Sequence, residues 1–257
     1  SDIASELSDA ELGSAAIVDR EKVAAGADIV VVLGGDGTLI SASRFPSAKN
    51  PRIIGVNMGT LGFLTEITRD ELFDILAQTI AGETRTEERS MLSVEVLRDK
   101  KVVREFAAMN DAVLTKQAIA RIFSVDLLVD GEFAATLRGD GVIVATPGGS
   151  TAYSMAAGGS IVHPQVDAIL VTPICPHSLT SRPLVLPGSA SLTLKLHMRA
   201  PSQNGDVYFT VDGQDGMELA PSDQIRIKKS PHSVRFVKSP TRTYFDVLGT
   251  KLKWANH

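Results

Sequence analysis

The sequence contains one cysteine, Cys175, among 257 residues. A single cysteine can form neither an intrachain disulfide nor a multi-cysteine metal cluster, so we expect a reducing, cytoplasmic environment. The chain also lacks a basic excess, since 26 Lys and Arg face 30 Asp and Glu. A nucleic-acid partner is therefore not expected, although a local basic site for a small anion stays open. No apolar run approaches the roughly 20 residues of a membrane helix, so no membrane partner is expected.

The residues that are present are typical of a folded, globular protein. Hydrophobic residues make up 44% of the chain and charged residues 22%, which excludes disorder and a coiled coil. The length allows one large domain or two modest ones. The first twelve residues are polar and hold no apolar signal core, so we expect them to be a shortened start.

Residues 10–82 alternate between helical and strand periodicity, which predicts βα units. Residues 29–33 form a β-branched apolar run of the kind buried on both faces of a parallel sheet, and this run ends in the glycine-rich residues 34–37. A second run, 53–56, ends in another glycine-rich turn, 57–62. Ligands bind at the carboxyl ends of the strands in open α/β sheets, so we expect a site there.

Two other segments have helical spacing. Residues 69–80 predict an amphipathic helix with Thr68 as its N-cap. Residues 243–254 predict a C-terminal helix that returns to the first domain. The apolar positions of the two helices are Leu72, Ile75, Leu76 and Ile80 in the first, and Phe245, Leu248, Leu252 and Trp254 in the second.

The apolar period changes from 3.6 to 2 after a charged hinge at residues 83–89. Residues 92–96, 125–129 and 192–196 alternate apolar and other side chains, which predicts half-buried antiparallel strands. Asp130-Gly131 lies between two such runs and predicts a hairpin turn.

These patterns predict an α+β protein with two domains. Residues 1–87 plus 230–257 would form a Rossmann-like α/β domain with a parallel sheet. Residues 88–229 would form a β-rich, β-sandwich-like domain, and the active site is expected in the cleft between the two.

The turn Gly34-Gly-Asp-Gly-Thr38 places one carboxylate among three glycines. Glycine lets backbone N–H groups approach a phosphate closely, and the N-terminus of the following helix favours an anion. Asp36 would repel phosphate unless it holds a metal ion or accepts a proton from an attacking hydroxyl. The alternative is a tight turn in which Asp36 only caps the helix. The Walker A and Gly-x-Gly-x-x-Gly spacings are both absent.

Two further polar segments follow predicted strands. Residues 146–154 carry glycines and hydroxyls at a helix start near Ser150, where hydroxyls can bind a ligand or cap the helix. Tyr153 can stack on a base or lie in the core. Asn110-Asp111 lies between two predicted strands, where a bulge or turn is the alternative to a site.

Together these segments resemble the NAD kinase family (ATP:NAD 2′-phosphotransferases) over nearly the whole chain. The Gly34–Thr38 turn is shared with diacylglycerol and sphingosine kinases, whereas the other motifs are more specific. They are Asn57-Met-Gly-Thr-Leu-Gly-Phe-Leu64, Asn110-Asp111, Thr146-Pro-Gly-Gly-Ser-Thr-Ala-Tyr153, Pro173-Ile-Cys-Pro-His-Ser-Leu179, Arg182-Pro183, Val211-Asp-Gly-Gln214 and Lys251-Leu-Lys-Trp254. The family usually has Thr or Ser at the position of Gly148, and it has a first strand that we expect before residue 1.

The resemblance implies transfer of the γ-phosphoryl group of ATP to the 2′-hydroxyl of the adenosine ribose of NAD, with Asp36 as general base. It implies a divalent cation such as Mg²⁺, carried mainly by ATP, and no metal ligands from the protein. The residues implied in phosphate or ATP binding are Gly34, Gly35, Gly37 and Thr38. The residues implied in dinucleotide binding are Gly37, Phe63, Asn110, Asp111, Arg121, Arg138, Asp140, Thr151, Ala152, Tyr153, Ser154, Ala156 and Gln214.

The family resemblance also implies a homotetramer or homodimer in which a neighbouring protomer contributes to the NAD site. Polyphosphate in place of ATP, and NADH in place of NAD, both stay open. Two alternative functions share part of the pattern. A lipid kinase would need an apolar channel for an acyl chain, and residues 110–154 suggest none. A non-catalytic dinucleotide sensor would have no use for the carboxylate of Asp36.

Overall fold

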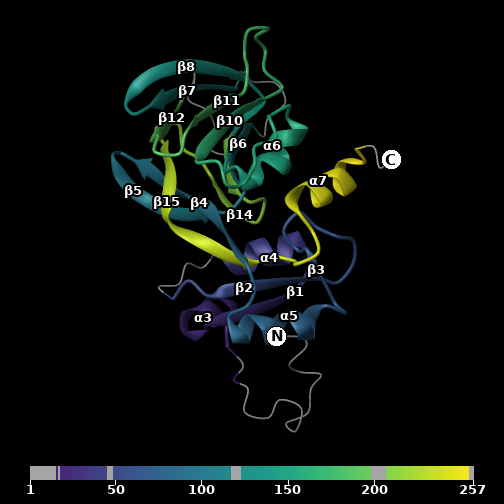
Figure 1. The fold of residues 1–257 in the computed structure, drawn as a ribbon. Helices are drawn as coiled ribbons and strands as arrows, with labels where there is room; N and C mark the ends of the chain where they lie inside the picture. The colour runs from purple at the N-terminus through teal and green to yellow at the C-terminus, as the bar shows by residue number, and fades with distance from the viewer. Residues whose placement is uncertain (1–15, 17, 45–48, 117–122, 198–206, 255–257) are drawn as a thin grey trace.

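The computed structural model describes residues 16, 18–44, 49–116, 123–197 and 207–254 (Figure 1). Strands dominate these residues, and they form two sheets. No helix within the described ranges is long and apolar enough to span a bilayer.

The α/β half lies at the bottom of Figure 1. Strand β2 pairs in parallel with β1, with β3 and with the C-terminal part of the long strand β15 (Gln224–Val237). The predicted parallel sheet is therefore present. The elements of this half are α3 (Arg20–Gly26), β1 (Ile29–Gly34), α4 (Asp36–Ser43), β2 (Arg52–Asn57), β3 (Ile67–Thr68) and α5 (Leu72–Ala81). The C-terminal helix α7 (Tyr244–Leu252) lies above them at the right of Figure 1.

The β-rich half packs one sheet against the other. Strands β15, β4, β12, β7, β8 and β5 belong to the sheet that also contains β1 and β2, and the second sheet has the order β11-β10-β9-β6-β13-β14. The remaining elements are β4 (Thr86–Arg98), β5 (Lys101–Ala108), β6 (Asp111–Lys116), β7 (Phe123–Val129), β8 (Glu132–Gly139), β9 (Gly141–Ala145), the 3₁₀ turn η1 (Gly148–Thr151), α6 (Tyr153–Ala156), β10 (Ala168–Ile174), β11 (Leu184–Pro187), β12 (Leu192–Leu196), β13 (Val207–Val211) and β14 (Asp215–Glu218).

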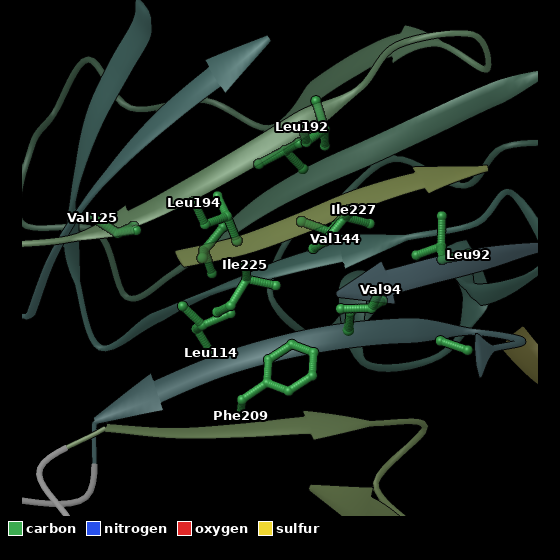
Figure 2. Packing of buried hydrophobic residues seen from close by; sticks show 14 of the residues in the cluster. Leu92, Val94, Leu114, Val125, Val144, Leu192, Leu194, Phe209, Ile225 and Ile227 are labelled. Atoms are coloured by element: carbon green, nitrogen blue, oxygen red, sulfur yellow. The ribbon is translucent and has the colours of Figure 1, made fainter. Parts of the chain in front are cut away.

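The largest hydrophobic core fills the space between these two sheets. Figure 2 shows Leu92, Leu192 and Ile225 of the first sheet among the same buried cluster as Leu114 and Phe209 of the second. Each of these five side chains is no more than 1% exposed. Alternating apolar side chains thus point inward from both sheets, as the period of 2 predicts for a β-sandwich.

Strands β4 and β15 connect the two halves without a break. They pair antiparallel from Gln224↔Leu97 to Val237↔Thr86, with a register shift between Lys229 and Ser233. Pro231 lies within this irregularity, where a residue without a backbone N–H is tolerated. The charged hinge expected at 83–89 is therefore partly wrong, because β4 already begins at Thr86.

The expectation that residues 29–33 are buried on both faces is wrong. Val30 and Val32 pack under α4 in one cluster with Leu39, whereas Val31 and Leu33 are 38% and 51% exposed. The cause is position in the sheet. Strand β1 is the end of the strand order, and α5 packs on β2 and β3 beside it, so the described residues cover one face of β1 more completely than the other.

Both predicted helices are present, but their first residues or their buried positions differ from the prediction. Helix α5 begins at Leu72 with Glu71 as its N-cap, so Thr68 is not the N-cap. Thr68 lies in the preceding turn, where its backbone N–H and hydroxyl donate to Oε2 of Glu71. Ile80 is 69% exposed, not inward-facing. Helix α7 begins with a reciprocal capping box between Thr243 and Asp246. Two residues predicted on its apolar face are exposed instead, Phe245 to 68% and Trp254 to 53%.

Candidate active site

The turn Gly34–Thr38 connects the end of β1 to α4. A Cβ atom at Gly34 would lie 2.7 Å from Oγ1 of Thr38, so this position requires glycine. The N-cap of α4 is Gly35, and Asp36 is already the first residue of the helix. The alternative in which Asp36 only caps the helix is wrong, because its carboxylate contacts a different segment of the chain.

That segment is the loop Gly62–Thr65. Oδ2 of Asp36 accepts from the backbone N–H of Phe63 at 2.7 Å. Oδ1 accepts from the backbone N–H groups of Leu64 and Thr65 at 3.1 and 3.0 Å, and from the hydroxyl of Thr65 at 3.0 Å. A Cβ atom at Gly62 would lie 2.0 Å from Oδ1. The two glycine-rich turns predicted to meet at this edge of the sheet are therefore joined through the carboxylate of Asp36.

Asn57 organises the far side of the same loop from the end of β2. Its Nδ2 donates to the carbonyl oxygen of Thr60 at 2.6 Å and to Oγ1 of Thr65 at 3.1 Å, and its Oδ1 accepts from the backbone N–H of Gly59. Asn57 is 7% exposed and Thr65 is fully buried. The loop that carries Phe63 to Asp36 is thus fixed at both ends by hydrogen bonds.

The β-rich half reaches the same turn through Gln214. Its Nε2 donates to the carbonyl oxygen of Gly37 at 2.8 Å. Gln214 follows the hairpin turn Asp212-Gly213 between β13 and β14, where both residues have positive φ. Two residues predicted to bind the dinucleotide, Gly37 and Gln214, are therefore in direct contact although they come from different halves.

Asn110 and Asp111 form a corner between β5 and β6. Asp111 is 5% exposed, and the backbone N–H of Tyr153 donates to its carboxylate. Burial raises the pKa of Asp111 to about 7, and the negative charge of the nearby Asp212 acts in the same direction. The carboxyl of Asp111 therefore titrates well above the usual range of an aspartate.

The turn at residues 146–151 packs directly on this corner. The hydroxyl of Thr146 donates to the carbonyl oxygen of Met109 at 2.8 Å and accepts from the backbone N–H of Gly149 at 2.9 Å. The backbone N–H of Thr146 donates to the carbonyl oxygen of Asn110. A Cβ atom at Gly149 would lie 2.1 Å from that carbonyl oxygen, so only glycine fits there. Gly148, by contrast, has ordinary space around it.

The helix expected near Ser150 is a 3₁₀ turn followed by the single helical turn α6. Tyr153 is 45% exposed, which contradicts a place in the core and leaves its ring open to a ligand. Ser154 is fully buried, and its hydroxyl is hydrogen-bonded to that of Thr172. The hydroxyl of Thr151 donates to the carbonyl oxygen of Gly148 at 3.3 Å. Ala152 is half-buried and Ala156 exposed.

Two other predicted residues lie beside the segment that follows β10. Asp140 forms a 2.6 Å ion pair with Lys116 and lies 3.9 Å from Nε2 of His177. The hydrogen bond from Lys116 is the main cause that holds the pKa of Asp140 below its usual value. The carbonyl oxygen of Arg138 accepts from the backbone N–H of His177. Arg121 lies outside the described residues, and the binding roles of all these residues stay predictions.

Three residues of this site were not named as functional from the sequence: Asn57, Thr65 and Asp212. Asn57 and Asp212 belong to motifs of the resemblance, so a signal for them was present. Thr65 follows its motif directly, but nothing local distinguishes it from a loop threonine. Its contact with Asp36 joins residues 29 positions apart, which only the folded chain reveals.

Comparison with known proteins identifies the family. Residues 16–84 match the model of the ATP-NAD kinase N-terminal domain, and residues 109–239 match that of the ATP-NAD kinase C-terminal domain. The chain is 48% identical to the NAD kinase of Geobacter metallireducens over 92% of this chain and 82% of that protein.

Two solved structures share the fold. Yeast NADH kinase complexed with NADH superposes with a TM-score of 0.85 at 32% identity, over 93% of this chain and 70% of that chain. An NAD kinase from Archaeoglobus fulgidus in complex with ATP superposes with a TM-score of 0.74 at 25% identity, over 92% and 86% of the two chains.

Proposed function

The chain belongs to the NAD kinase family of enzymes, and from this premise we propose that it transfers the γ-phosphoryl group of ATP to the 2′-hydroxyl of the adenosine ribose of NAD. The 2′-oxygen forms a bond to the γ-phosphorus while the bond to the β–γ bridging oxygen breaks, so the products are NADP and ADP. The proton of the hydroxyl passes to the carboxylate of Asp36. The solved relatives named for their NADH and ATP complexes support this choice of substrates.

The observation that carries the proposal is the setting of Asp36. Its carboxylate lies at the start of α4, between Gly35 and Gly37, whose backbone can face a phosphate. A ribose hydroxyl is a weak nucleophile until a base accepts its proton, and a positioned carboxylate supplies about 10² to 10⁴ in rate. The rest of the acceleration comes from holding the two nucleotides in line.

Asp36 keeps an acceptor position for the substrate. A carboxylate has about four acceptor positions, two on each oxygen. Oδ1 accepts three hydrogen bonds from Leu64 and Thr65, whereas Oδ2 accepts one from the described residues, that of the backbone N–H of Phe63. The second lone pair of Oδ2 is therefore the one that can accept the proton of the ribose hydroxyl.

The divalent cation enters the reaction as part of the ATP substrate. Among the described residues, no three His, Cys, Asp or Glu side chains lie together as ligands of a metal would. When bound, Mg²⁺ neutralises charge on the phosphates of ATP. The chain itself would contribute the backbone of Gly34, Gly35 and Gly37 and the hydroxyl of Thr38 as phosphate donors.

The proposed reaction is tested by NADP formation from NAD, ATP and Mg²⁺, followed with an NADP-specific dehydrogenase. Asp36→Asn is expected to lower kcat by at least about 10²-fold, because an amide cannot accept the proton. Asp28→Asn is the matched control, because Asp28 is an exposed carboxylate at the opposite end of β1. Calorimetric binding of NAD to both variants separates loss of catalysis from loss of the site.

Two outcomes would contradict the proposal. Near-normal turnover by Asp36→Asn would exclude Asp36 as the base. Binding of NAD by the unaltered chain without any NADP formation, with ATP or with polyphosphate, would favour a dinucleotide sensor.

A further inference from the structure

The turn Asp212-Gly213 uses its aspartate in an unusual way. Both residues are in the left-handed region, with φ values of 52° and 63°, and with Gln214 they form the three-residue loop between β13 and β14. The carboxylate of Asp212 does not face solvent. It accepts from the backbone N–H of Met109 at 2.9 Å through Oδ2, and from those of Asn110 and Asp111 at 2.7 and 3.1 Å through Oδ1.

These three N–H groups need a partner because the chain leaves the sheet at this point. Strand β5 ends at Ala108 and β6 begins at Asp111, so residues 109 and 110 form a bend between the strands. Met109 is 2% exposed, so its backbone N–H cannot donate a hydrogen bond to bulk water. A buried N–H without a partner destabilises the fold, whereas hydrogen bonds to a charged acceptor are strong. One carboxylate therefore fixes three consecutive peptide groups.

The carbonyl oxygens of the Asn110–Asp111 corner are hydrogen-bonded as well. The carbonyl oxygen of Asn110 accepts from the backbone N–H of Thr146, and that of Asp111 accepts from the backbone N–H of Asp212. The direction of the Asn110 and Asp111 side chains is thus set by peptide groups that cannot rotate. Asp212 is the one side chain in this arrangement that holds all three N–H groups.

Asp212 faces Asp111, whose carboxylate also accepts a hydrogen bond from the backbone N–H of Tyr153. The guanidinium of Arg44, at the end of α4, faces Asp212. Burial raises the pKa of Asp212, and the three N–H groups and Arg44 oppose this rise. The charge of Asp212 is one of the causes that raise the pKa of Asp111.

We propose that Asp212 is a positioning residue, which holds the Asn110–Asp111 corner in the geometry that binds the ribose hydroxyls of the dinucleotide. This inference rests on the proposed function, in which the family resemblance implies that Asn110 and Asp111 bind the ribose of NAD. An ionised Asp111 accepts hydrogen bonds from ribose hydroxyls, and a protonated one accepts fewer. The negative charge of Asp212 opposes ionisation of Asp111, so it also shapes the pH dependence of NAD binding.

The test is calorimetric binding of NAD to Asp212→Asn between pH 5.5 and 8.5. Asparagine tolerates the left-handed backbone, and its Oδ1 can keep two of the three hydrogen bonds, but its NH₂ group faces the N–H of Met109. We expect the Kd for NAD to rise about tenfold at pH 8. We expect the pH below which binding weakens to fall by about one unit, because Asp111 loses a neighbouring charge.

Asp130→Asn is the matched control. Asp130 and Gly131 also form an Asp-Gly hairpin turn with left-handed φ values, 52° and 86°, and Asp130 accepts from the backbone N–H of Ser191 at an exposed position. This variant should bind NAD like the unaltered chain at every pH. Hydrogen exchange of residues 109–111 gives a second readout, in which Asp212→Asn should lose protection and Asp130→Asn should not.

The outcomes separate this inference from the proposed function. An unchanged Kd and an unchanged pH profile in Asp212→Asn would overturn the inference and leave the function standing. Asp212→Asn could instead raise the Kd only in proportion to its loss of thermal stability, with an unshifted pH profile. That result would assign Asp212 a purely structural role and would also overturn the inference. Should Asp212→Asn fail to fold, Asp111→Asn decides the point, because binding that still weakens below pH 7 would exclude Asp111 as the titrating group. No NAD binding by the unaltered chain would overturn the proposed function itself.

Discussion

Gln214 donates a hydrogen bond from Nε2 to the carbonyl oxygen of Gly37 at 2.8 Å, although 177 residues separate the two along the chain. One partner lies on a hairpin of the β-rich half and the other in the turn that carries Asp36. Gln214 is exposed, and a hydrogen bond of this kind contributes only about 1 kcal/mol to folding. The main effect of this hydrogen bond is therefore to fix the position of the β13–β14 hairpin relative to the turn that carries Asp36.

Removal of this contact should affect activity more than stability. We expect Gln214→Ala to lower kcat/KM for NAD about tenfold, because positioning errors are costly in catalysis. The midpoint of thermal unfolding should change by less than about 3 °C. Gln224→Ala, at an exposed position of β15, is the control for loss of a glutamine side chain. Equal kinetics of the two variants would show that the contact has no role in the reaction.

Two glycines of one loop should differ sharply in their tolerance of a methyl group. A Cβ atom at Gly62 would lie 2.0 Å from Oδ1 of Asp36, whereas one at Gly59 would meet no atom within 4 Å. We therefore expect Gly62→Ala to displace Asp36 and to lower kcat by at least about 10²-fold. Gly59→Ala should keep kcat within about threefold of the unaltered enzyme. The steady-state rates of both variants check this, and an active Gly62→Ala would contradict the placement of Asp36.

The buried carboxyl of Asp111 should make the stability of the fold depend on pH. Its pKa is about 7 in the folded chain and about 4 in an unfolded one. The unfolded chain thus releases this proton first as pH rises, so stability present at pH 4 is lost by pH 8. The loss from this one group amounts to at most about 4 kcal/mol.

Asp111→Asn removes that titration and leaves a side chain of similar shape. We expect its free energy of unfolding to fall less between pH 5 and 8 than that of the unaltered chain. At pH 8 the variant should be the more stable of the two. Urea unfolding at four pH values measures the difference, with Asp130→Asn as the control. Parallel curves for the Asp111→Asn variant and the unaltered chain would show that Asp111 titrates normally.

Local signals in the sequence predicted several parts of this fold. The glycine turn after residues 29–33, the hairpin at Asp130-Gly131 and the strand before Thr146 depend on short-range preferences, and all three are present. The resemblance to the family, and the α/β and β-rich halves, are confirmed as well. These features follow from neighbouring residues or from motifs, so they can be recognised without knowledge of the folded chain.

Other parts depend on contacts between distant segments. Asp130 and Asp212 both precede a glycine in a hairpin turn with positive φ, but only Asp212 reaches a bend more than 100 residues away. The turns differ in length, two residues against three, and this difference does not show which carboxylate reaches a distant segment. The open face of β1 likewise depends on where α5 packs, which the apolar run itself does not specify.

Because β4 and β15 run through both halves, they determine how the protein unfolds and whether its halves can be separated. Strand β4 lies between the two regions that match family models, and it pairs with β15 along nearly its whole length, through both halves. Neither region alone therefore contains a complete set of strands for its own sheet. Cutting the chain at the boundary should leave two fragments that associate or aggregate, and heating the intact chain should give one calorimetric transition. Any movement of one half against the other would have to bend this strand pair, whose register shifts between Lys229 and Ser233.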